Sequence, residues 1–189
     1  MVEFLKSRRK YLLVSLVATA GFLAFFTYVS RHWMLVMTVP GQECFPYRHW
    51  IIKRTKDLHV GQFIAFRGYG IPNAPDRVLW GKKVLATGGD RIVVEKASGN
   101  GIININGMDR SFPIQGFVTV YNHDGQRIRS LTVYGRDTFG RPLTMIQSTQ
   151  GVIPEGKYFV VGDTERSYDS RYWGLVDASW VVGRAYPVF

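Results

Sequence analysis

The sequence predicts a mostly β domain that follows one N-terminal transmembrane helix. An uncharged, largely apolar run extends from Tyr11 to Val29 and is long enough to cross a bilayer as a helix. Beyond it, short apolar stretches alternate with turns rich in Gly, Pro and polar residues, a pattern typical of strands. These stretches are too short and too scattered for a βα repeat, so we do not expect a parallel α/β fold.

The N-terminal segment divides into a basic tail, residues 1–10, and the apolar run, residues 11–29. An excess of Lys and Arg favours the cytoplasmic side, so we expect residues 34–189 on the far side of the membrane. A cleavable signal peptide also begins with basic residues and is the alternative. An anchor is favoured because the run is longer than a usual signal-peptide core and no small-x-small cleavage pattern follows it.

Composition narrows the possible functions. The 189 residues carry a net charge of +10, yet no nucleic-acid motif or Lys/Arg-rich run accompanies the charge, so we expect no nucleic-acid partner. Attraction to an anionic membrane surface is the simpler interpretation. The chain has one cysteine, Cys44, which excludes an internal disulfide and a Cys-based zinc site. A thiol redox protein has little support, because no second cysteine can resolve a mixed disulfide.

The strands are expected as short separate pieces. The apolar stretches lie at residues 50–54, 60–66, 77–85, 91–95, 102–107, 117–121, 158–161 and 180–186. Residues 98–101 are interpreted as a turn between two of these strands. Residues 34–40 form either a strand or an interfacial segment. The rest of residues 112–150 is polar and loop-rich, and we expect no chemistry there.

The densest group of charged and hydroxyl side chains lies in residues 162–174, directly after an apolar run. Acidic, Arg and Ser side chains placed this close can pair with one another and fix the shape of a loop under a cleft. The alternative is a solvated turn with incidental ion pairs.

This segment resembles the last signature box of the type I signal peptidases, which are membrane-bound serine–lysine endopeptidases. That box reads Gly-Asp-Asn-Arg-Asp-Asn-Ser-x-Asp-Ser-Arg-Tyr-Trp-Gly. Residues 167–174 match its second half, while residues 164–166 are one residue shorter than the usual stretch. The resemblance implies a signal-peptidase-like β domain in which Ser167 supports the catalytic lysine. Asp163, Asp169 and Arg171 are expected to hold the loop through structural ion pairs.

Residues 82–90 resemble the family's lysine box, Lys-Arg-x-x-Gly-x-Pro-Gly-Asp, although Ala86 and Gly88 stand where the family has Gly and Pro. The resemblance makes Lys82 the catalytic base. A lysine can accept a proton only as the neutral amine, which burial favours. The period of a strand places Lys82 on one face with Val78, Trp80 and Val84. The alternative is an ordinary edge-strand lysine that faces water.

The candidate nucleophile is Cys44. In the conjugative-transfer branch of the family the nucleophile lies in a Ser-x-Pro triplet just after the anchor, and residues 44–46 resemble that triplet with Cys in place of Ser. A thiol needs less activation than a hydroxyl. The backbone N–H of Cys44 and the side chain of Gln42 are the expected oxyanion donors. The resting protonation of the Cys44–Lys82 pair and an engineered Ser→Cys replacement both stay open.

Histidine chemistry is the rival interpretation of the thiol. A Cys–His dyad is possible in principle, and His49 is the nearest histidine in sequence. None of the four histidines lies in a recognisable motif, whereas Lys82 does. We expect neither a metal site nor a cofactor.

The resemblance implies a single-pass peptidase of the bacterial inner membrane, with its catalytic domain in the periplasm. In the conjugative-transfer branch the substrate is a pilin precursor, which some members also cyclise through an acyl-enzyme. One alternative is a general type I signal peptidase that cleaves exported preproteins. Another is a catalytically inactive, membrane-tethered binding homologue that kept the cleft. The expected partners are the substrate's peptide segment and the lipid bilayer.

Overall fold

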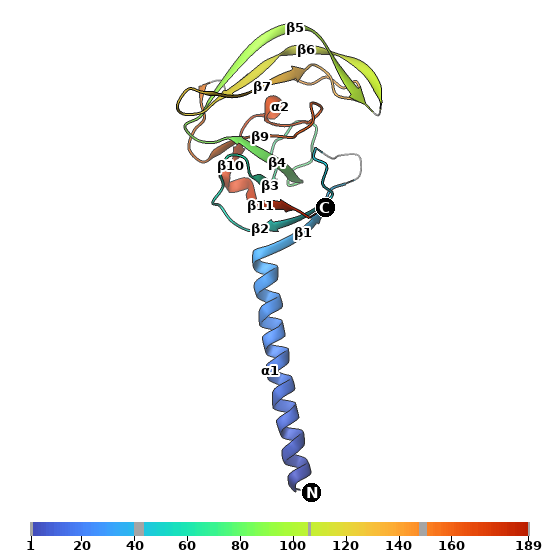
Figure 1. Ribbon diagram of the computed structural model, residues 1–189, viewed down its shortest axis with the longest axis vertical. Helices are drawn as coiled ribbons and strands as arrows, with labels where there is room; N and C mark the ends of the chain where they lie inside the picture. The colour runs from blue at the N-terminus through green and yellow to red at the C-terminus, as the bar shows by residue number, and fades with distance from the viewer. Residues whose placement is uncertain (1, 40–43, 106, 148–150, 189) are drawn as a thin grey trace. The chain divides into compact units, whose positions relative to one another are not determined.

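The computed structural model describes residues 2–39, 44–105, 107–147 and 151–188, without the side chains of residues 2–7 (Figure 1). The chain divides into two compact units, Met1–Met34 and Leu35–Phe189. The first is the helix α1 (Val2–His32), whose segment Arg8–His32 is long and apolar enough to cross a membrane. A signal sequence would have the same properties, so the anchor stays an expectation.

The second unit consists of two β-sheets, which confirms the mostly β fold. The larger sheet has the order β1-β2-β11-β3-β4-β9-β10, and the smaller has the order β7-β6-β5-β8. The strands of the larger sheet are β1 (Trp33–Met37), β2 (His49–Lys53), β3 (Phe63–Arg67), β4 (Leu79–Ala86), β9 (Lys157–Val161), β10 (Val176–Asp177) and β11 (Val181–Pro187). The smaller sheet contains β5 (Arg91–Ile105), β6 (Met108–Tyr121), β7 (Arg127–Tyr134) and β8 (Gly151–Val152).

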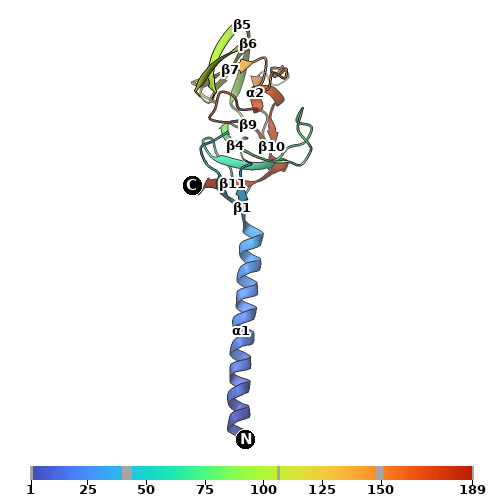
Figure 2. The ribbon, with the colours of Figure 1, turned by 90° about the vertical axis from the view of Figure 1, so that its right-hand side faces the viewer.

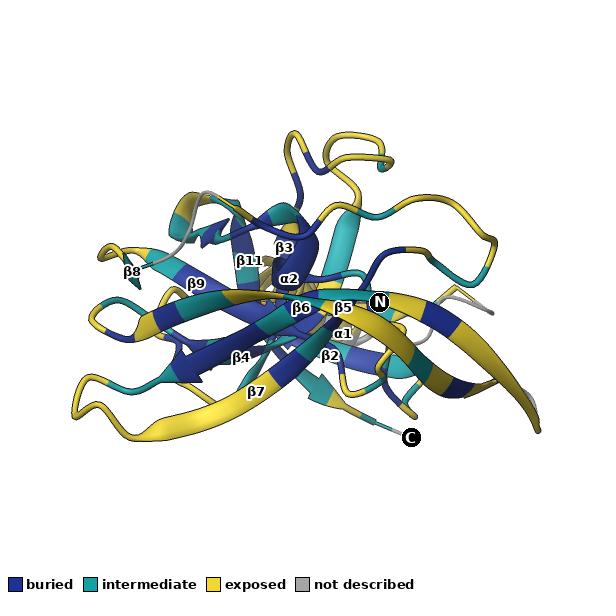
Figure 3. Ribbon diagram, turned by 90° about the horizontal axis from the view of Figure 1, so that it is seen from above, coloured by how far each residue is buried: buried dark blue, intermediate teal, exposed yellow. Residues whose placement is uncertain are grey.

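Two short helical turns complete the second unit. The helix α2 (Ser170–Trp173) contacts both β7 and β9 and is largely buried, as Figure 3 shows. The 3₁₀ turn η1 (Ala178–Trp180) leads into β11, so the expected closing strand begins one residue later than predicted. The segment predicted as a strand or an interfacial stretch forms β1.

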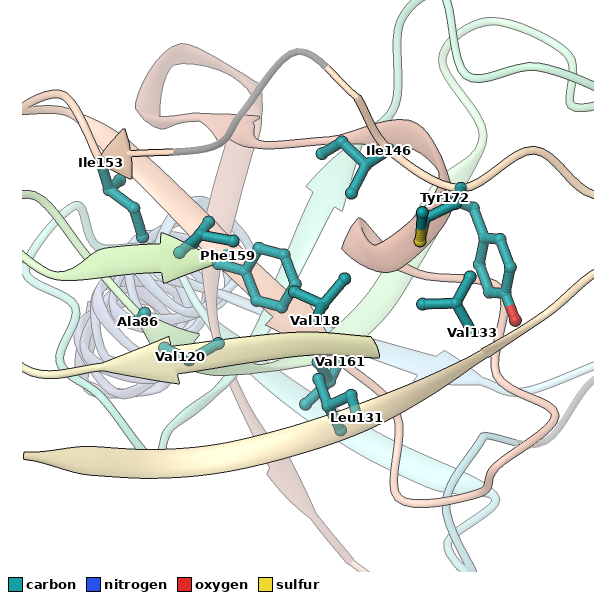
Figure 4. Packing of buried hydrophobic residues seen from close by; sticks show 12 residues of the cluster. Ala86, Val118, Val120, Leu131, Val133, Ile146, Ile153, Phe159, Val161 and Tyr172 are labelled. Atoms are coloured by element: carbon teal, nitrogen blue, oxygen red, sulfur yellow. The ribbon is translucent and has the colours of Figure 1, made fainter. Parts of the chain in front are cut away.

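Strand β9 is buried on both faces and joins the two main apolar clusters. Phe159 and Val161 pack against Val118 and Leu131 of the smaller sheet, and Figure 4 shows these side chains meeting between the strands. The alternate residues of β9 belong to the other cluster, with Val84 of β4. A strand with two buried faces needs an unbroken apolar run, which is what its sequence provides.

The smaller sheet corrects one prediction. Residues 98–101 do not form a turn: β5 continues through them and pairs with β6 over the whole length of a long hairpin (Figure 2). A register irregularity between Lys96 and Gly99 absorbs the glycines. At Gly101 a Cβ would lie 2.8 Å from the ring of Tyr134, so this glycine allows close packing and does not mark a turn.

Candidate functional site

Lys82 lies in the interior of the larger sheet. Its strand β4 pairs with β3 on one side and β9 on the other, so the edge-strand alternative is wrong. The Lys82 side chain is 1% exposed and shares its face with buried Val84. Its Nζ lies 5.8 Å from the centre of the Trp80 ring.

The structure brings together the three side chains that the motifs single out. Lys82 Nζ lies 2.8 Å from Cys44 Sγ and 2.8 Å from Ser167 Oγ. Ser167 Oγ lies 3.7 Å from Cys44 Sγ. Ser167 is buried, whereas Cys44 is half-buried and therefore reachable from solvent. A thiol, an amine and a hydroxyl from three distant parts of the chain thus form one compact cluster.

Gly162 provides the space in which this cluster forms. A Cβ on this residue would lie 2.3 Å from Ser167 Oγ and 3.0 Å from the Cβ of Cys44. No side chain can occupy that position without moving one of the two. Sequence reasoning included Gly162 in the signature match but missed this steric role.

The signature loop is fixed by a buried ion pair. Arg171 Nε donates to Asp169 Oδ1 at 2.8 Å and Nη2 donates to Oδ2 at 2.9 Å, and both side chains are at most 3% exposed. The guanidinium also donates to the backbone carbonyls of Ser167, at 2.9 Å, and of Thr132, at 2.8 Å. Asp169 accepts a further hydrogen bond from the Gly162 N–H. The pair therefore orients Ser167 and Gly162 together.

The predicted roles of Asp163 and Gln42 are not seen in the structure. Asp163 has an exposed side chain and takes part in no ion pair among the described residues. Its backbone N–H instead donates to the Cys44 carbonyl at 3.1 Å, which ties the segment that contains Cys44 to the signature loop. Gln42, the expected oxyanion donor, lies outside the described residues.

Strand β7 supports the loop from the region in which we expected no chemistry. The Tyr134 N–H donates to the hydroxyl of Tyr172 at 3.2 Å, and the Tyr134 hydroxyl donates to Glu165 at 3.1 Å. Burial, followed by the charge of Glu165, raises the pKa of Tyr134 to about 12. The polar sequence of residues 112–150 gave no signal of this role, because the contacts join segments more than 30 residues apart.

A second support comes from Tyr168, at the variable position of the signature box. Its hydroxyl donates to the Pro72 carbonyl at 2.9 Å, and its ring packs against that of Trp80. Burial raises the pKa of the Tyr168 hydroxyl. These contacts connect the residue beside Ser167 with the strand that carries Lys82.

Three of the four histidines have other partners, and the fourth, His49, lies in β2. His59 and His123 lie beside Asp57 and Asp124 on the surface, with most of each imidazole exposed. The His32 ring contacts a backbone carbonyl within α1. The amine of Lys82, and not one of these three imidazoles, contacts the Cys44 thiol.

Comparison with known proteins gives the chain a family. A family model described as signal peptidase, peptidase S26, matches residues 5–189. Signal peptidase I of Haemophilus influenzae is 44% identical over 45 residues, which are 23% of this chain and 13% of that protein. Conjugal transfer protein TraF of Agrobacterium fabrum is 38% identical over 66 residues, 35% of this chain and 36% of that protein.

A third relative is also a signal peptidase. Signal peptidase I of Aquifex aeolicus is 46% identical over 39 residues, 20% of this chain and 15% of that protein. The alignments span between 13% and 36% of the length of these relatives. The family match, in contrast, covers nearly the whole chain. The chain therefore belongs to the signal peptidase family, peptidase S26.

Proposed function

We propose that this protein is a membrane-anchored endopeptidase that processes a conjugative pilin precursor with Cys44 as nucleophile and Lys82 as general base. The observation that carries the proposal is the position of Lys82 Nζ, buried and 2.8 Å from both Cys44 Sγ and Ser167 Oγ. A nucleophile, a base and a group that orients the base are the parts that covalent hydrolysis requires.

In the first step the Sγ of Cys44 attacks the carbonyl carbon of the scissile peptide bond, and the Lys82 amine takes the thiol proton. The Ser167 hydroxyl keeps Nζ directed toward the sulfur. The oxyanion develops beside the backbone N–H of Cys44, with Gln42 as a second donor. Lys82 then returns the proton to the leaving nitrogen, and a thioester links the substrate to Cys44.

The second step decides between trimming and ring formation. Water that gives its proton to Lys82 releases a linear product. The amine at the other end of the pilin can attack the thioester instead, which joins the two ends of the chain. A thioester suits the second route because it stays reactive toward amines.

The substrate class rests on the similarity to a conjugal transfer protein and on the position of Cys44 shortly after the apolar segment. The second candidate is a general signal peptidase that cleaves exported preproteins, which the similarity to two signal peptidases I supports. In both cases α1 acts as the anchor, with the basic tail in the cytoplasm and the β domain in the periplasm.

Co-expression with a candidate pilin and with an exported preprotein tests both candidates. Mass spectrometry of the pilin should show trimming with the intact protein and a further loss of one water if a ring forms. The Cys44→Ala variant should leave the precursor uncut, and Cys44→Ser should keep some trimming. Continued processing in the Ala variant would refute the role of Cys44, and cleavage of the preprotein alone would favour the second candidate.

A further inference from the structure

The contact between Cys44 and Lys82 also determines what an oxidant does to this site. Cys44 is half-buried, so a small hydroperoxide can reach its sulfur. A cysteine thiolate that meets a peroxide becomes a sulfenic acid. The fate of that sulfenic acid depends on the nearest nucleophile.

A disulfide within the chain is impossible here because Cys44 is the chain's one cysteine. The Lys82 amine lies 2.8 Å from the sulfur and is almost completely buried. The Ser167 hydroxyl is farther from the sulfur, at 3.7 Å, and is a weaker nucleophile. Among the described residues, the amine is thus the group placed to attack an oxidised sulfur.

We propose that hydroperoxides convert Cys44 and Lys82 into a covalent sulfur–nitrogen crosslink that thiols reverse. In the first step the thiolate attacks the O–O bond of the peroxide; the sulfur keeps one oxygen and hydroxide or alkoxide leaves. In the second step the lone pair of the Lys82 nitrogen attacks the sulfur, the S–O bond breaks, and water leaves with a proton from the amine. The product is a sulfenamide, with two hydrogen atoms fewer than the reduced protein.

Reduction runs through thiol exchange. A small thiol attacks the sulfenamide sulfur, the Lys82 amine leaves with a proton, and a mixed disulfide forms on Cys44. A second thiol molecule frees Cys44 and carries away the disulfide. The crosslink occupies both reactive groups at once and protects the sulfur from irreversible oxidation to a sulfinic acid.

The position of the Lys82 amine makes the crosslink specific for this lysine. The neighbouring residue Lys83 points to the other face of β4, with its Nζ 5.7 Å from the centre of the Phe63 ring. Lys83 is therefore a matched control: it lies on the same strand, has the same chemistry, and faces away from the sulfur. The chemistry itself needs the geometry of the pair and not the proposed peptidase activity.

The test is peptide mapping of the full-length protein in detergent after treatment with hydrogen peroxide. Trypsin should release residues 32–48 and 78–83 as one linked species, lighter by two hydrogen atoms than the two peptides combined and separable by dithiothreitol. Lys83→Arg should leave the link intact. Lys82→Met should abolish it and should drive Cys44 to the sulfinic acid. Fragmentation should locate a gain of two oxygen atoms on Cys44 itself, because Met34 and Met37 in the same peptide can each gain one.

Recovery of Cys44 in the wild-type protein as an unlinked sulfenic or sulfinic acid would overturn the inference. A link that survives in Lys82→Met would do the same. The readout requires no substrate, so it separates this inference from the proposed function. If no crosslink forms but cleavage still depends on Cys44, the crosslink is refuted and the peptidase role stands. If the crosslink forms but the Cys44→Ala variant still cleaves the precursor, the role of Cys44 in the peptidase is refuted and the crosslink stands.

Discussion

Replacing Gly162 with Ala should disable the site while leaving the fold in place. The new Cβ would lie 2.3 Å from Ser167 Oγ and 2.7 Å from its Cβ, closer than real Cβ contacts. To restore ordinary contact the Ser167 hydroxyl must move by roughly 1 Å. A shift of that size breaks its 2.8 Å contact with Lys82 Nζ.

A misplacement of about 1 Å in a catalytic group costs on the order of 100-fold in rate, so we expect a loss of that size in kcat for Gly162→Ala. The overpacking itself should cost about 1–3 kcal/mol of stability. The assay is cleavage of a precursor peptide by the detergent-solubilised protein, with thermal denaturation to confirm the fold. Gly81→Ala is the matched control, because a Cβ there meets nothing within 4 Å although the residue adjoins Lys82.

A double variant separates the steric mechanism from general damage. If Gly162→Ala acts by displacing the Ser167 hydroxyl, then adding it to Ser167→Ala should cost much less than it does alone. If the loss in kcat of the double variant equals the product of the losses of the two single variants, this reasoning is contradicted. A Gly162→Ala protein that cleaves within about threefold of the wild type would refute it altogether, since catalysis would then not need the present position of the hydroxyl.

Three further predictions concern the supports of the site. Arg171→Met leaves the buried Asp169 carboxylate unpaired, so it should cost about 3–5 kcal/mol in thermal denaturation, and adding Asp169→Asn should restore part of that loss; a double variant as unstable as the sum of both would contradict this. The hydrogen bond from Lys157 lowers the pKa of Asp177 below its usual 3.8. Asp177→Asn should therefore destabilise the protein at neutral pH, with the deficit shrinking as the pH falls below about 4; a deficit that does not change with pH would refute the pairing. Because the pKa of Tyr134 is raised from 10.0 to about 12, its contribution is present below pH 10 and lost between these values. The stability advantage of the wild type over Tyr134→Phe should shrink over that range, and a constant advantage would contradict it.

The sequence was sufficient to single out three side chains that meet in the structure, those of Cys44, Lys82 and Ser167. The strand period and the lysine box both indicated Lys82, and the structure places it on the buried face shared with Val84. The resemblance indicated Cys44 and Ser167, which come from segments with no local pattern that would join them. Their meeting depends on pairings across the chain, so composition and periodicity alone could not have predicted it.

The supports of the site could not be predicted in the same way. Tyr134 and the Thr132 carbonyl act through contacts with the signature loop, and an alternating polar strand carries no signal of its distant partner. Glycine was the second source of error. The sequence around Gly101 predicts a turn, yet in the structure this glycine marks a close approach of the neighbouring Tyr134 ring. A glycine's sequence context does not distinguish these two uses.

The most direct test of the central claim is intact-mass analysis of the protein after acid quenching during turnover of a precursor peptide. If Cys44 is the nucleophile and Lys82 its base, a fraction of the protein should carry the acyl fragment as a thioester that hydroxylamine removes. Cys44→Ala should carry none, and Lys82→Met should neither acylate nor cleave. Cleavage that persists in Cys44→Ala, or acylation at full rate without the Lys82 amine, would contradict the account.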